Sequence, residues 1–123
     1  MSQKYYLEAA TPLGKKIHTT KSYWNYIVNR KHPEIKNQKH KAIETLTNPD
    51  TIKQSQVDEK VFLYYQKITD KYFCIVAKHL DVNGYIVTAY ITKKLAKGKI
   101  IWQSQAKLSY SRQKRYNFFT NPV

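Results

Sequence analysis

The chain has 123 residues, which is enough for one domain with one buried core and too few for two such domains. Its 22 Lys and Arg residues against 8 Asp and Glu residues give a formal net charge of +14, which disfavours a cationic partner and favours nucleic acid. No apolar run approaches the ~20 residues that cross a bilayer, so a membrane protein is not expected. An N-terminus without an apolar stretch and a single cysteine, Cys74, indicate the cytoplasm.

The first expected elements are two helices. Thr20 can cap a helix that should end at His32, because a residue before proline is pushed out of the α region. Pro33 suits the first turn of a second helix, which the segment NPD at 48–50 ends. The residues expected to be buried are Tyr23, Trp24, Ile27 and Val28 in the first helix, and Ile35, Ala42, Ile43 and Leu46 in the second.

Strands are expected in the rest of the domain. Four segments rich in Ile, Val, Tyr and Phe follow the helices, at 51–55, 61–68, 72–80 and 85–92. The short gaps between them allow hairpins but not the long crossovers of parallel strands, so the sequence predicts an antiparallel meander. The expected fold class is therefore α+β, with two N-terminal helices packed on one face of a curved antiparallel sheet.

The end of the chain is less regular. The segment at 94–104 reads as a turn followed by one more short strand, and the segment after it mixes basic and aromatic residues without a firm period. We expect one domain over residues 1–103 and a basic, aromatic C-terminal extension over residues 104–123.

The strongest candidate for chemistry is the junction of Arg30, Lys31 and His32 before Pro33. Histidine as a residue type can both take and give a proton near neutral pH, while Arg and Lys can hold a phosphate. RNA carries its own nucleophile, the 2′-hydroxyl, so its cleavage needs only a base, an acid and a cation near one phosphate. The alternative is a solvated helix cap, which is the more common role of such a junction.

Other motifs are weaker. His18 and His79 lie in strand-like alternation and His40 lies among lysines of a helix, so packing or a solvated surface explains each. Cys74 is alone in a buried strand and no histidine pair has a metal-ligand spacing, so neither a metal site nor a cofactor is expected. Thr88 and Tyr90 point to one face of their strand, where sheet packing is an equal explanation.

Four blocks of the sequence, taken together and in this order, carry a resemblance to a known family. They are TPLGKKIHTTKSYWNYIVNRKHPEI, AIETLTNPDTIKQS, VFLYYQ and GYIVTAYITKKLAKGKIIW, which span roughly residues 11–102. The chain resembles the bacterial and phage proteins of the barnase, EndoU, colicin and RelE-like nuclease fold. This resemblance implies a metal-independent endoribonuclease of toxin type, whose open sheet face receives RNA.

The resemblance also implies roles for individual residues. It makes His32 the general acid or base, Arg30 and Lys31 phosphate ligands, and Tyr90 a further member of the catalytic set. The chain departs from the resemblance at His18, where arginine is more usual. The residues expected to bind or position RNA are Ser55, Tyr65, Lys67, Thr88, Lys93, Lys94 and Lys97.

The expected partners are RNA, either ribosome-associated mRNA or tRNA, and an acidic cognate antitoxin protein, with no membrane. A second reading is a non-catalytic basic module that binds RNA or DNA along its backbone. A third is a subunit of an assembly. Cleavage of a labelled RNA by the purified protein separates the first two readings, and a neighbouring small gene for an acidic protein would favour the toxin over both alternatives.

Overall fold

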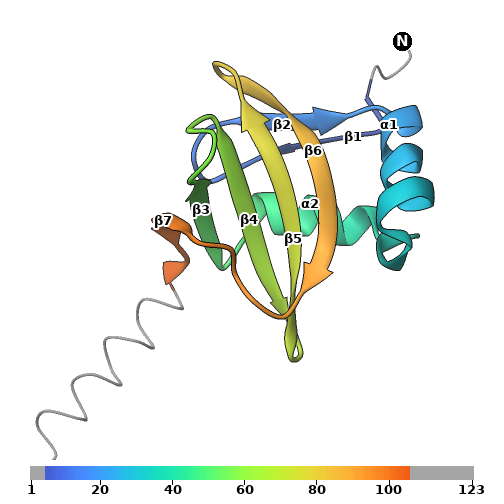
Figure 1. Ribbon diagram of the computed structural model, residues 1–123. Helices are drawn as coiled ribbons and strands as arrows, with labels where there is room; N and C mark the ends of the chain where they lie inside the picture. Colours follow the sequence, from blue (N-terminus) through green and yellow to red (C-terminus); the bar gives the residue numbers. More distant parts are fainter. Residues whose placement is uncertain (1–4, 106–123) are drawn as a thin grey trace, which may run out of the picture.

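The computed structural model describes residues 5–105, which form one mixed sheet with helices against one face and one edge (Figure 1). The seven strands follow the order β1-β2-β6-β5-β4-β3-β7. All neighbouring strands are antiparallel except β2 and β6. The strands are β1 (Leu7–Ala10), β2 (Lys16–Thr19), β3 (Thr51–Ser55), β4 (Val61–Ile68), β5 (Lys71–His79), β6 (Asn83–Thr92) and β7 (Gly98–Gln103).

The first helical run lies between β2 and the basic junction. It begins as α1 (Lys21–Tyr26), whose N-cap Thr20 accepts a hydrogen bond from the backbone N–H of Tyr23 at 3.2 Å. It continues as a π-helical turn, η1 (Ile27–Lys31), and ends at His32, whose backbone (φ −139°, ψ 75°) has left the α region that the following proline disfavours. The run buries one stripe against the sheet, formed by Trp24, Ile27 and Val28.

The second helical run differs from the expected helix. Pro33 opens only a 3₁₀ turn, η2 (Pro33–Ile35), and the chain then bends at Asn37, which has φ 64°. The helix α2 (Lys39–Thr47) starts six residues after Pro33. The prediction of one helix beginning at Pro33 is therefore wrong, and the basic junction does not lie at the start of α2.

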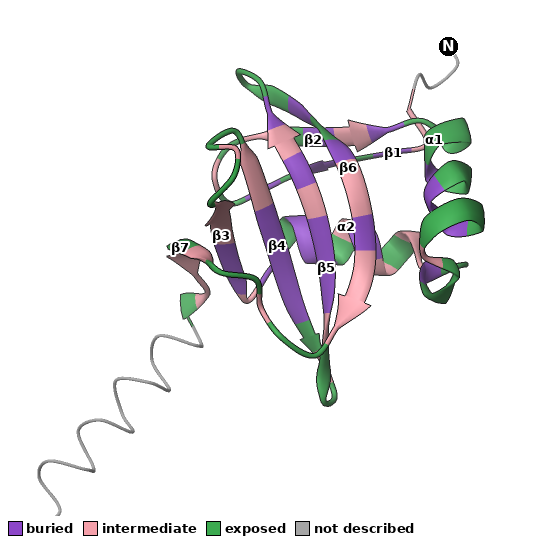
Figure 2. Ribbon diagram, viewed as in Figure 1, coloured by how far each residue is buried: buried purple, intermediate pink, exposed green. Residues whose placement is uncertain are grey.

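The main core lies between the sheet and α2. Ala42 and Leu46 of α2 are fully buried against one face of β4, β5 and β6. That face contributes large apolar side chains, and Figure 2 shows the buried residues concentrated in β4 and β5. The strand residues of this core are Leu7, Ala9, Ile17, Ile52, Tyr64, Phe73, Ile75, Ala77, Ile86 and Ala89.

The opposite face of the sheet carries only a small cluster. Leu63, Tyr65 and Cys74 are buried there, covered in part by Leu95 from the connection between β6 and β7. This connection is tied down because the backbone N–H of Ala96 donates to the Tyr65 hydroxyl at 2.9 Å. We call this whole face of the sheet the open face, because no helix covers it (Figure 1).

The predicted arrangement of two helices on an antiparallel sheet is wrong, although the protein does combine helices with a sheet. The chain starts with a β-hairpin of two four-residue strands, β1 and β2, which precedes the helices. The sheet is mixed because β2 pairs in parallel with the start of β6 over Lys16–His18. Gly84 in β6 makes this possible, since a Cβ there would contact the Lys78 carbonyl and the Ile17 side chain.

Of the remaining expectations, the meander of strands β3 to β6 and the short strand after it are confirmed. No helix within residues 5–105 is long and apolar enough to cross a membrane. The expected C-terminal extension over residues 104–123 lies outside the described residues, apart from Ser104 and Gln105.

Candidate nucleic-acid site

His32 lies at the edge of β6, where η2 packs against the strand. Its ring makes an edge contact with Tyr90, with 5.4 Å between the ring centroids. Its Nδ1 lies 3.3 Å from a carboxylate oxygen of Glu34, and about a third of the His32 side chain, 32%, is exposed. A carboxylate on Nδ1 orients an imidazole so that Nε2 is the atom left for a substrate.

Tyr90 joins this edge to the centre of the open face. Tyr90 is paired with Cys74, which in turn is paired with Tyr65, so the three side chains form a row across β6, β5 and β4. Burial raises the pKa of Cys74 to about 12, and burial together with the neighbouring thiol raises the pKa of the Tyr90 hydroxyl. Tyr90 is therefore a neutral hydrogen-bonding group near pH 7 and does not serve as a base.

Thr88 lies on the same face of the sheet, two residues before Tyr90 in β6. Its Oγ1 is buried, and within the described residues it has no hydrogen-bond partner. A buried hydroxyl without a partner is uncommon in proteins and is one of the features that accompany binding sites. The structure thus brings His32 into contact with Tyr90, and Thr88 lies two residues before Tyr90 on the same face of β6. The sequence predicted the shared face of Thr88 and Tyr90 but not the contact between His32 and Tyr90.

Two other expected RNA-binding residues lie elsewhere. Ser55 is at the end of β3, three strands away from β6, and its hydroxyl accepts hydrogen bonds from the backbone N–H groups of Val57 and Asp58. Tyr65 is fully buried, and burial raises the pKa of its hydroxyl to about 12. These residues support a turn and the β6–β7 connection, so the structure does not place them beside His32.

The expected basic residues lie on η1, on β4 and on the connection between β6 and β7. Arg30 and Lys31 are exposed, and the Lys31 ammonium lies 5.8 Å from the centroid of the Tyr26 ring. Lys67 is exposed on β4, with its ammonium 5.7 Å from the centroid of the Tyr72 ring. The exposed lysines of the β6–β7 connection are Lys93, Lys94 and Lys97.

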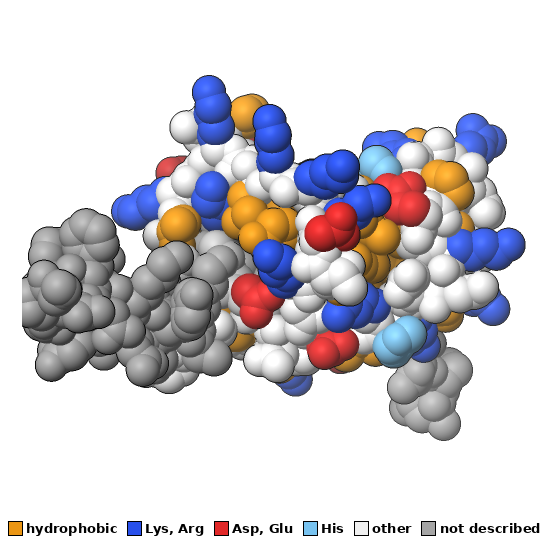
Figure 3. All heavy atoms as spheres, turned by 90° about the horizontal axis from the view of Figure 1, so that it is seen from below, with side chains coloured by type: hydrophobic (Ala, Val, Ile, Leu, Met, Phe, Trp, Pro, Cys, Tyr) orange, Lys and Arg blue, Asp and Glu red, His pale blue; other side chains and the backbone are white. Residues whose placement is uncertain are grey.

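Seen from below, the surface of the molecule carries many positive charges, but they are not uniformly distributed. Figure 3 shows Lys and Arg side chains spread over the surface, with Asp and Glu side chains and exposed hydrophobic groups between them. Such a surface attracts an anionic chain without fixing one path for it.

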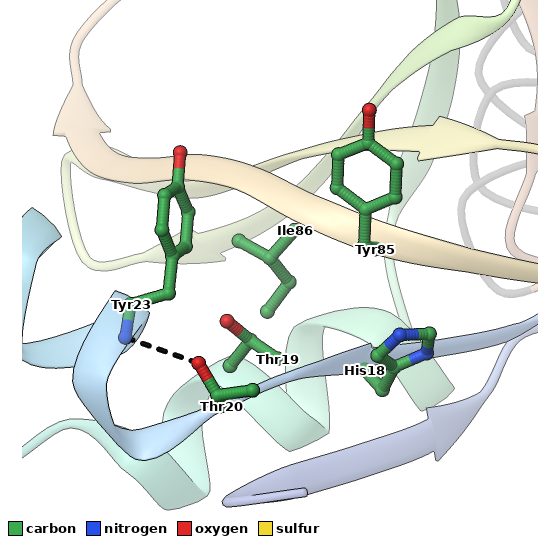
Figure 4. Close-up of a pocket in the computed structure, with 6 residues that line it drawn as sticks. All are labelled: His18, Thr19, Thr20, Tyr23, Tyr85 and Ile86. Atoms are coloured by element: carbon green, nitrogen blue, oxygen red, sulfur yellow. Dashed lines mark hydrogen bonds between the residues drawn. The ribbon is translucent and has the colours of Figure 1, made fainter.

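The sequence reasoning missed a hollow of about 250 Å³ between β2, α1 and β6. Figure 4 shows the rings of Tyr23 and Tyr85 with Ile86 between them and with Thr19 and Thr20 below. The hollow forms where β2 leaves β6 to enter α1, and the Tyr23 hydroxyl bridges the gap by donating to the Val87 carbonyl at 2.7 Å. His18 completes the lining.

His79 has a structural role. It is buried, its ring stacks on Phe62 with 4.0 Å between centroids, and its Nε2 lies 2.8 Å from the Tyr64 hydroxyl. Burial, with the positive charge of Lys15, lowers its pKa to about 4. Its imidazole is therefore neutral near pH 7 and shares a hydrogen bond with the Tyr64 hydroxyl.

Residues 5–105 contain no group of three or more His, Cys, Asp or Glu side chains that could hold a metal ion.

No protein-family model, curated protein or solved structure matches this chain. The function is therefore inferred from the site itself and from the motifs of the sequence.

Proposed function

We propose that this protein is a metal-independent endoribonuclease that cuts single-stranded RNA at the His32 edge of the open face. The observation that carries the proposal is the placement of His32, which is partly exposed, oriented by Glu34 and in contact with Tyr90 on β6. The resemblance of the sequence blocks to toxin-type nucleases supports the same activity, with the cytoplasm as the site of action.

In the proposed reaction, Nε2 of His32 takes the proton of an RNA 2′-hydroxyl. The 2′ oxygen then bonds to the adjacent phosphorus as the bond from phosphorus to the 5′ oxygen breaks, and the 5′ oxygen takes a proton from water. The products are a 2′,3′-cyclic phosphate and a 5′-hydroxyl. Arg30 and Lys31 offset the charge that develops on the phosphate.

The purified full-length protein and a labelled single-stranded RNA test this proposal. We expect cleavage in the presence of a chelator, cyclic phosphate ends, and no cleavage where the 2′-hydroxyl at the cut is replaced by hydrogen. Cleavage that continues on the 2′-deoxy substrate, or that stops with the chelator, would overturn the mechanism.

A second candidate function is non-catalytic binding of single-stranded nucleic acid. The exposed rings of Tyr23, Tyr26 and Tyr85 favour it, because aromatic side chains beside lysines are the usual platform for unpaired bases. Saturable RNA binding without any cut products in the same assay would favour this function over the nuclease.

The toxin form of the proposal adds a protein partner. An acidic antitoxin would be drawn to the basic open face and would cover His32. Overproduction of the protein alone should arrest growth, and co-expression of the antitoxin should relieve the arrest. Harmless overproduction would contradict the toxin role. It would not contradict the nuclease activity, which the cleavage assay tests separately.

A further inference from the structure

We infer that the hollow between β2, α1 and β6 is a binding subsite for one unpaired base of the RNA, and this inference rests on the proposed function. Its volume of about 250 Å³ is below the roughly 300–1,000 Å³ of sites for drug-sized ligands, which fits a single planar ring system. Its walls supply aromatic faces, and its floor supplies an isoleucine and threonine hydroxyls (Figure 4).

The hollow opens on the same face of the sheet as the His32 edge. Tyr85 is paired with Lys78, and Tyr90 with Cys74, four residues away on the regular strand β5, so the two tyrosines share a face. They do so although they are five residues apart, because a register shift leaves Val87 without a partner in β5. Along β6 the two rings are separated by roughly 15 Å, a distance that a few nucleotides can span.

The aromatic groups of the hollow are held in place before any ligand binds. The Tyr23 ring is fixed by its hydrogen bond to the Val87 carbonyl, and the His18 ring stacks on Tyr5 with 3.9 Å between centroids. Tyr85 is 39% exposed, and its ring is available to a ligand. A ring that is already ordered loses little conformational entropy when a base stacks on it.

The charges around the hollow favour a nucleotide, which brings a phosphate with its base, over a ligand that offers only an acidic or a neutral side chain. Lys16 precedes His18 by two residues in β2, and Lys78 lies opposite Tyr85 in β5, so both are on the face that carries Tyr85. Lys78 also pairs with Asp58 at 3.4 Å, and Glu8 lies opposite His18 on β1. The base is therefore expected to enter the hollow, with its phosphate toward Lys16 rather than toward Glu8.

The test measures binding of the full-length protein to a short single-stranded 2′-O-methyl RNA, which has no free 2′-hydroxyl and is not cut. Tyr85→Ala should weaken binding roughly 5- to 100-fold, the range for loss of stacking on one base. Tyr85→Phe should bind like the parent because it keeps the ring. Ile100→Ala removes an exposed apolar side chain from β7, at the other edge of the sheet, and is the control.

A set of probes, each lacking the base at one position, locates the contact. At one position, the abasic probe should bind the parent protein more weakly than the intact probe does. The same two probes should bind Tyr85→Ala equally well, because the contact with the base is already lost in this variant. Equal binding by Tyr85→Ala and the parent, an equal loss in Ile100→Ala, or additive losses at every abasic position would overturn the subsite. Because the probe is not cut, these outcomes do not depend on whether His32 cleaves RNA.

Discussion

The two faces of the central sheet use the same strands but different side chains. On the α2 face, β4, β5 and β6 contribute Tyr64, Ile75 and Ala89, which are fully buried. On the open face the buried cluster is small, and the groups along β6 are hydroxyls, a phenol and an imidazole that reaches over the edge. The α2 face supplies most of the stability, so the open face is free to hold polar groups that stability alone would not select.

The sharpest test of this division is removal of the imidazole on the open face. His32→Ala should lower the rate of RNA cleavage ~10²–10⁴-fold, the usual loss for a general acid–base, while thermal unfolding stays close to that of the parent. His40→Ala, which removes an exposed histidine from α2, should leave the rate unchanged. Equal cleavage by His32→Ala and the parent would show that His32 is only the residue before a proline.

The opposite result is expected from the α2 face. Leu46→Ala should lower the free energy of unfolding by about 2–5 kcal/mol, because Leu46 is fully buried and the change leaves a cavity. Leu95→Ala, the matched change on the open face, should cost less than about 1.5 kcal/mol because Leu95 is only partly buried. Denaturant unfolding measures both, and a larger loss from Leu95→Ala would contradict the division of roles.

Acid should lower the free energy of unfolding through His79 on the α2 face. Its pKa is about 4 in the folded protein and roughly 6.5 in an unfolded chain, so the unfolded state binds more protons between these values. Its contribution is complete above about pH 6.5 and is lost as the pH falls toward 4, by up to about 3 kcal/mol. Denaturant unfolding at several pH values should show this slope, and His79→Phe should flatten it while His40→Gln should not.

The smallest effect is expected from the lysines of the β6–β7 connection. Replacing Lys93, Lys94 and Lys97 with Gln should reduce the slope of log K against log salt by about 0.7 for each phosphate contact that is lost. Replacement of three lysines on the α2 side makes the same change in net charge, and it should alter the slope less. The control set is Lys36, Lys39 and Lys41. Equal effects of the two sets would mean that only net charge matters.

The sequence was most informative where one strand supplies its own pattern. The segments that become β3 to β6 are continuous in β-branched and aromatic residues, and their expected bounds differ from the observed ones by two residues at most. The first hairpin was missed because its strands have four residues each and one of them, LEAA, contains two alanines. The parallel pairing was missed because it joins residues far apart in the sequence, which local periodicity does not report.

The candidate site shows the same limit. The sequence identified His32 and the shared face of Thr88 and Tyr90, because both follow from residue type and alternation. It did not identify Glu34 beside His32, nor the contact of His32 with Tyr90, since both depend on how η2 packs. Tyr85 was missed for a different reason: simple alternation places it opposite Tyr90, and only the register shift at Val87 returns it to the open face.

The parallel ladder between β2 and β6 also limits how early the chain can fold while it is being synthesised. The first hairpin lacks its neighbouring strand until residues 83–85 have left the ribosome, so Ile17 cannot be covered by β6 in the early nascent chain. The contact between His32 and Tyr90 likewise needs the last residues of β6. If this protein cuts RNA, a ribosome making it carries an incomplete and inactive chain for most of the time that translation takes, which protects the message being read.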